Sequence, residues 1–98
     1  MKKKLIESIP CEGLNYGTHI DVEVSYSKDR SPRGYYINVS PIKHEGNMKS
    51  FIMSSYTSSR LLMKTNRYSD KQFEQAVEFG KTAAPDLVMQ VIEKNKAA

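Results

Sequence analysis

The 98-residue sequence has little cysteine and no long apolar run, and both shortages exclude classes of protein. Cys11 is the single cysteine, so no disulfide bond can form within the chain, and nothing indicates an oxidising compartment. The basic start Met1–Lys4 is followed by only three apolar residues before Pro10, which is too short for a signal peptide or a membrane span. We therefore expect a cytoplasmic protein without a membrane partner.

The sequence also lacks the motifs of catalysis and of metal or cofactor binding. His19, His44 and Cys11 lie in three separate segments without the spacing of metal ligands. There is no Gly-x-Ser-x-Gly turn, and no motif places a histidine near the serines at 54–59. The two glycines of segment 13–17 are not followed by the lysine and helix of a phosphate-binding loop. We expect no metal, no cofactor and no enzymatic activity.

The length and composition indicate one small domain that spans residues 1–98. Hydrophobic residues make up 39% of the chain and charged residues 27%, which is ordinary for a soluble domain. A chain this short buries a small share of its surface, so hiding one more face in a dimer would add stability. We therefore expect a homodimer.

The clearest element is an amphipathic helix over residues 69–94. Ser69 and Gln72 have the spacing of a capping box, in which the hydroxyl accepts a backbone N–H and the amide reaches back to the Ser69 backbone. Pro85 predicts either a kink or the start of a second helical segment. In both cases one apolar stripe results. Its residues are Phe73, Val77, Gly80, Ala84, Leu87, Val88 and Val91.

Alternating apolar and polar residues predict strands before the helix. The segments are Lys2–Ile9, Ile20–Ser27, Tyr35–Ile42, Met48–Tyr56 and Arg60–Thr65. The first of these has a weak pattern, and the last could also begin a helix, although the turn at 57–59 and the new cap at Ser69 favour a strand. Strands followed by a helix indicate an α+β fold, an antiparallel meander of about four strands with the helix on one face. The other face is left for solvent, a ligand or a second copy.

Basic residues and tyrosines are concentrated in the middle of the chain. The net charge of the whole chain is +4, whereas segment 28–67 has eight basic and two acidic residues, and the helix is slightly acidic. Tyrosine rings on the free sheet face would stack with bases, and the cations would contact phosphates. Alternatively, the charges keep the sheet soluble and the tyrosines serve as good strand formers. The candidate nucleic-acid-binding residues are Arg30, Arg33, Tyr36, Lys43, Lys49, Tyr56, Arg60, Lys64 and Arg67.

Two resemblances accompany this interpretation. The segments Arg33–Tyr36 and Val39–Pro41 resemble part of small uncharacterised proteins of phages and mobile elements of Gram-positive bacteria. The order of strands and helix is similar to that of PC4-like single-stranded-DNA-binding domains. This similarity implies a curved sheet that binds nucleic acid and a helix that joins two subunits.

Two functional hypotheses follow from the sequence. The first is a small nucleic-acid-binding accessory protein, with single-stranded DNA as its ligand. The second is a protein-interaction or regulatory module of a phage or mobile element, in which the free face or an exposed strand edge pairs with another protein.

Overall fold

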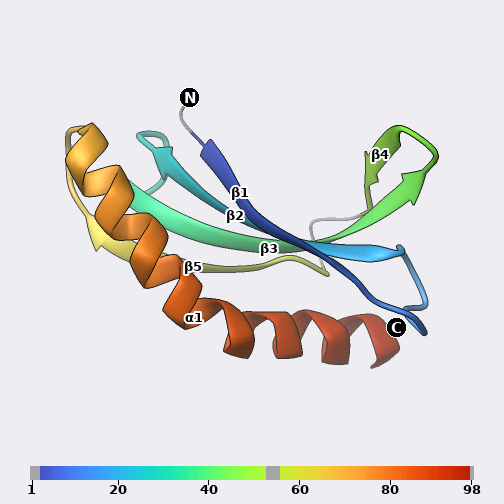
Figure 1. Cartoon of the computed structure of the whole chain (residues 1–98). Coiled ribbons are helices and arrows are strands. Elements are labelled where there is room, and N and C mark those ends of the chain that lie inside the picture. Colours follow the sequence, from blue (N-terminus) through green and yellow to red (C-terminus); the bar gives the residue numbers. More distant parts are fainter. Residues whose placement is uncertain (1–2, 53–55, 98) are drawn as a thin grey trace.

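The computed structural model describes residues 3–52 and 56–97, and its elements form an α+β fold (Figure 1). An antiparallel sheet is followed by one long helix that packs on it, as the order of elements predicted. The elements are β1 (Lys3–Pro10), β2 (His19–Ser27), β3 (Gly34–Glu45), β4 (Met48–Phe51), β5 (Ser58–Lys64) and α1 (Asp70–Ala97).

The long strand β3 organises the sheet. One edge of β3 pairs with β2, which in turn pairs with β1. The other edge is shared, because β5 pairs with residues 34–39 and β4 pairs with residues 42–45. The chain therefore leaves β3 through a short hairpin and returns to the same edge with β5. In a simple meander, by contrast, β5 would pair with β4.

The predicted boundaries of the last two strands need correction. Strand β4 ends at Phe51, before the predicted end at Tyr56, and Met53–Ser55 lie outside the described residues. Ser58 and Ser59 were expected in a turn, but they already belong to β5. The interpretation of Arg60–Thr65 as a strand is confirmed.

The core lies between α1 and one face of the sheet, called the inner face. Alternate residues of β2 and β3 are buried there, as the period of two predicted. On the helix, Val77, Gly80, Ala84, Leu87 and Val91 of the predicted stripe are buried, and Phe73 and Val88 are partly buried against the core. The opposite face carries Tyr36, Asn38 and Ser40 and is free of the helix; it is called the outer face.

The start of α1 is capped by the sheet as well as by its own sequence. The Gln72 backbone N–H donates to Ser69 Oγ at 3.1 Å, which confirms one half of the predicted capping box. The other half is replaced, because the Ser69 N–H donates to the Tyr35 hydroxyl at 2.9 Å. That hydroxyl donates in turn to the Ser69 carbonyl at 3.0 Å. A buried tyrosine of β3 therefore fixes the first turn of the helix.

The helix runs without interruption through Pro85, so of the two alternatives the second helical segment does not occur. Figure 1 shows that the two halves of α1 run in different directions, as expected for a proline in a helix interior. No helix of the described chain has the length and apolar character needed to cross a membrane.

The C-terminal end of α1 holds the loop between β1 and β2. Asn95 is fully buried, and its side-chain amide donates to the Tyr16 carbonyl at 2.7 Å and accepts from the Tyr16 N–H at 3.1 Å. The Asn15 side chain donates to the Asn95 carbonyl at 3.0 Å. This clamp joins residues about eighty positions apart in the sequence, and the helical pattern did not predict it.

Candidate nucleic-acid interface

Most of the predicted site residues gather at the end of the sheet where β2 turns into β3. Ser27 pairs with Gly34 across this turn, and Gly34 pairs on its other side with Lys64 of β5. The Thr65 N–H donates to the Arg33 carbonyl at 3.0 Å, so the segment after β5 lies beside the turn. We call the exposed basic residues of this region the cationic end. They are Lys28, Arg30, Arg33, Arg60, Lys64 and Arg67.

The cationic end carries an excess of unneutralised positive charge. Its segments contain six basic residues and one acidic residue, Asp29. Within the described part of the chain, no carboxylate forms an ion pair with any of the six. Such a concentration of cations attracts polyanions and is screened by salt.

Arg30 is the best-positioned cation of this group. Its guanidinium carbon lies 4.3 Å from the centre of the Tyr36 ring, and its Nη1 donates to Ser59 Oγ at 2.8 Å. The Ser59 hydroxyl donates onward to the Asn38 side-chain oxygen at 2.9 Å. The Arg30 backbone N–H donates to Ser27 Oγ at 3.2 Å, which fixes the turn. These contacts hold the guanidinium over the outer face.

A shallow hollow lies beside this arginine, and it brings a second arginine into the group. Arg30, Tyr36, Ser59 and Arg60 line it, together with Ser31 and Leu61. Arg60 stands opposite the core residue Ile37, so it belongs to the inner face of β5, and its exposed side chain lines the hollow at the edge of the sheet. Guanidinium groups and a hydroxyl are well suited to binding a phosphate, because their N–H and O–H groups donate to its oxygens.

Tyr36 lies on the outer face as the alternation predicted, but it does not offer a free ring. Only 8% of the residue is exposed, and the Arg30 guanidinium covers it. Its hydroxyl donates to the Pro32 carbonyl. The side of the Arg30 plane that faces away from Tyr36 is the surface that a base could stack on, since guanidinium planes stack with bases as aromatic rings do.

Three predicted site residues lie away from the cationic end. Lys43 belongs to the far half of β3 and pairs with Glu45 at 2.8 Å. That hydrogen bond and charge raise the pKa of Lys43 and lower the pKa of Glu45. Lys49 of β4 pairs with Asp21 at 3.6 Å. The Tyr56 ring stacks on another tyrosine, in the loop between β1 and β2, with a centroid distance of 5.5 Å. The nine predicted residues therefore do not form one surface.

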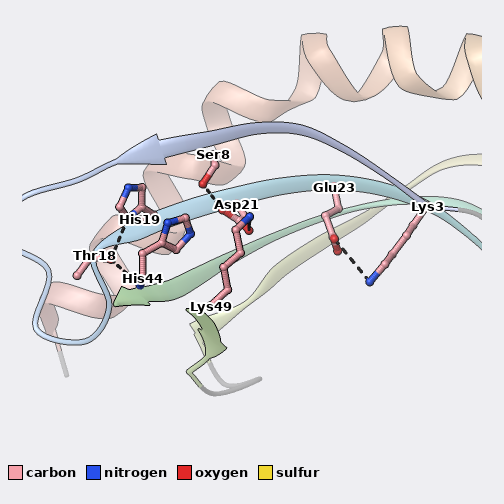
Figure 2. A network of polar contacts seen from close by, with 8 residues as sticks. All are labelled: Lys3, Ser8, Thr18, His19, Asp21, Glu23, His44 and Lys49. Carbon is pink, nitrogen blue, oxygen red and sulfur yellow. Dashed lines mark hydrogen bonds and ion pairs between the residues drawn. The ribbon is translucent and has the colours of Figure 1, made fainter. Parts of the chain in front are cut away.

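The far end of the outer face carries a polar network that the sequence did not reveal (Figure 2). The His19 and His44 rings stack with centroids 3.9 Å apart, although the two residues belong to separate segments. The Thr18 hydroxyl accepts the His44 backbone N–H at 2.9 Å and lies 2.8 Å from His19 Nδ1. His19 stands opposite Ile42 in the sheet, and His44 follows two residues later on the same face. Only the pairing of β2 with β3 brings the rings together.

Asp21 joins three strands in this network. Its carboxylate, on β2, accepts a hydrogen bond from the Ser8 hydroxyl of β1 and pairs with Lys49 of β4 (Figure 2). The carboxylate is mostly buried, so these two contacts compensate for the loss of water. Among residues 3–52 and 56–97, no group of three or more His, Cys, Asp or Glu side chains could hold a metal ion.

The histidine pair predicts a pH dependence of stability. Burial lowers the pKa of His44 below its ordinary 6.5, and the neighbouring His19 and Lys49 lower it further, while Asp21 opposes them. The folded state therefore binds fewer protons than the unfolded state in this range, so the contribution of His44 to stability is complete above pH 6.5 and decreases as the pH falls toward the lowered pKa. We expect the Tm to fall between about pH 7.5 and pH 5.5, measured by circular dichroism.

The His44→Gln variant provides the comparison for this measurement. Because glutamine does not titrate in this range, the fall in Tm between about pH 7.5 and pH 5.5 should be smaller in the variant. An equal fall in both proteins would show that other groups cause the dependence.

Comparison with known proteins adds no assignment to this geometry. The chain matches no protein-family model, no curated protein and no solved structure.

Proposed function

We propose that this chain is a small accessory protein that binds nucleic acid, with single-stranded DNA as the preferred ligand, through its cationic end. The observation that carries the proposal is the Arg30 guanidinium, which lies over Tyr36 and donates to Ser59, with Arg60 lining the hollow beside it. The cluster acts by binding and contains no nucleophile with a general base beside it. The proposal therefore includes no catalytic step.

The charge of the region supports a polyanion as the ligand. Cations without acidic partners can bind phosphates at a small free-energy cost, because no existing ion pair has to break. The six cations also lie in the turn between β2 and β3, along β5 and in the segment after β5, so a chain of phosphates fits them better than a single small anion. Release of counterions then supplies a salt-dependent part of the affinity.

The geometry of Arg30 supports a single strand over a duplex. One side of its plane lies against Tyr36, and an unpaired base could stack on the other side. Stacked bases in a duplex present no free face to such a group. The resemblance to PC4-like domains agrees with this ligand but remains a prediction. The proposal depends on the residues of the cationic end.

The proposal predicts binding that weakens steeply with salt and depends on two arginines. We expect the Arg30→Ala/Arg60→Ala variant to bind a fluorescent single-stranded oligonucleotide about tenfold more weakly than the unmodified chain at low salt. If each arginine contacts one phosphate, the slope of log affinity against log salt should decrease in magnitude by roughly 1.4. Fluorescence anisotropy over a series of salt concentrations measures both quantities.

A matched variant separates the site from net charge. Lys43 lies in the far half of β3 and Lys96 at the C-terminal end of α1, and both are exposed, so Lys43→Ala/Lys96→Ala loses the same charge away from the cationic end. At about 0.1 M salt, where the Debye length is about 10 Å, its affinity should remain within about twofold of the unmodified chain, since exposed charges beyond that distance are screened. Absence of binding at low salt, or equal losses in the two variants, would contradict the proposal. Equal affinity for duplex DNA would contradict the preference for a single strand.

A further inference from the structure

Strand β1 is an edge strand of the sheet, and the edge that faces away from β2 is unpaired in the described structure. One edge of β1 pairs with β2, and no other strand of the described residues pairs with its opposite edge. Leu5 on this strand is 42% exposed, and Lys3, Lys4 and Glu7 are exposed as well. An open edge offers backbone N–H and C=O groups to a further strand.

An apolar groove accompanies this edge on the inner side, between β1 and α1. Two hollows follow one another along it. Phe73 and Val77 form the apolar part of the first, whose other lining side chains are charged or polar, and Ile9, Ala84 and Val88 line the second together with Glu7. Lys81 lines both, so the hollows adjoin. A strand added to β1 would cover part of this apolar lining.

The charges on β1 are arranged for pairing with a copy of the same strand. Lys4 stands opposite Val24 and Glu7 stands opposite Val22, and both valines face the core. Residues three apart would ordinarily point to opposite faces of a strand. The register shift between Leu5 and Glu7 brings Lys4 and Glu7 to the same face.

The outer face of β1 follows the same symmetry. Lys3 stands opposite Ser25 and Ser8 stands opposite Asp21, and both partners belong to the outer face of β2. The strand therefore has one basic and one other polar residue on each face, placed symmetrically about the bond between Leu5 and Ile6.

From this arrangement we propose that two copies of the chain pair through β1, antiparallel and across a two-fold axis, to form one continuous sheet. Directly opposed residues of antiparallel strands lie on the same face, so Lys4 of each copy meets Glu7 of the other. Lys3 likewise meets Ser8 on the outer face. The register shifts of the two copies then lie opposite each other at the centre of the pair, where the pairing is irregular because Leu5 belongs to the outer face and Ile6 packs against the core.

The charges select this register over its nearest competitor. A register shifted by two residues also joins like faces, but it places Lys4 opposite Ile9 and Glu7 opposite Ile6. In that register the lysine and the glutamate of each copy face apolar side chains, which is unfavourable in a strand pair. A second copy is therefore the occupant that fits, because one strand supplies both members of each ion pair.

Charge reversal tests the pairing. The chain has a mass of 11.2 kDa, so sedimentation equilibrium should give about twice this value at high concentration. In Lys4→Glu the two contacts become glutamate against glutamate, and in Glu7→Lys they become lysine against lysine. Each variant should dissociate with a constant about tenfold larger or more, since like charges opposite each other destabilise a strand pair. An equimolar mixture of the two variants should restore the dimer, because both contacts of the mixed pair again join an acidic and a basic side chain.

Exposed charges on α1 provide the controls. Lys96→Glu and Glu93→Lys make the same charge changes outside the groove and should dimerise as the unmodified chain does. A monomer at every concentration would overturn the proposal, as would a dimer that Lys4→Glu leaves intact. Failure of the mixture to recover, with both variants folded by circular dichroism, would overturn the assigned register. None of these readouts depends on nucleic-acid binding, so this proposal and the proposed function can fail separately.

Discussion

Replacing Asn95 with alanine is expected to lower the free energy of unfolding by about 1–3 kcal/mol, because it removes the two hydrogen bonds that hold the Tyr16 backbone to α1. Asn95 is fully buried, and its amide is the sole side chain shown to bond both the N–H and the C=O of that residue within the described structure. An unsatisfied buried donor or acceptor costs about 1–3 kcal/mol, and the removed amide also leaves a small void.

Urea unfolding followed by circular dichroism measures this loss. The matched control is Asn47→Ala, which changes an exposed asparagine in the turn between β3 and β4. Surface substitutions of this kind usually change stability by less than about 0.5 kcal/mol. The Tyr16 amide should also exchange its hydrogen faster in Asn95→Ala, since the loop is no longer held to α1. Equal stabilities of the two variants would show that the clamp contributes nothing.

A valine at Gly80 is expected to cost about 2–3 kcal/mol, because it fills the place where α1 closely approaches β2. A Cβ atom at Gly80 would lie 2.7 Å from Val24 Cγ2, with Ile6 Cδ1 at 3.4 Å and Leu62 Cδ1 at 3.5 Å. Val24 is fully buried and its branched side chain has little freedom to move. Overpacking of a core costs about 1–3 kcal/mol, and valine gains little over glycine in helix propensity.

Two further variants make this prediction specific. Thr82→Val places a valine on the exposed side of the same helix and should change stability little. Combining Gly80→Val with Val24→Ala removes the clashing methyl group, so the double variant should be more stable than the sum of the two single losses predicts. Strict additivity, or a neutral Gly80→Val, would contradict the close approach.

The elements of the fold were predictable because their signals are local. The alternation from Ile20 to Tyr26 and the helical stripe from Phe73 to Val91 each depend on neighbours within a few residues, and the structure confirms both. The same alternation correctly placed Tyr36 on the outer face. The alternation along β3 also places Lys43 on the inner face, so this lysine does not belong to the outer face with Tyr36.

The candidate site was predictable only in part. Charge counting along the sequence found the arginines and lysines that now form the cationic end. It could not find that Lys49 is neutralised by Asp21 or that Arg30 covers the Tyr36 ring. These contacts join residues that are distant in the sequence and belong to different elements, so no periodic pattern predicts them.

The sequence by itself determined the α+β class, the two central strands over Ile20–Ser27 and Tyr35–Ile42, the helix with its apolar stripe and the basic character of the middle of the chain. The tertiary structure alone decided how these parts meet: β4 and β5 on one edge of β3, the Tyr35 cap of α1, the Asn95 clamp and the stacked histidines. The physical reason is the range of the interactions. Periodicity and capping act within a few residues, whereas strand register and buried hydrogen bonds are fixed when distant segments pack together and every buried polar group needs a partner.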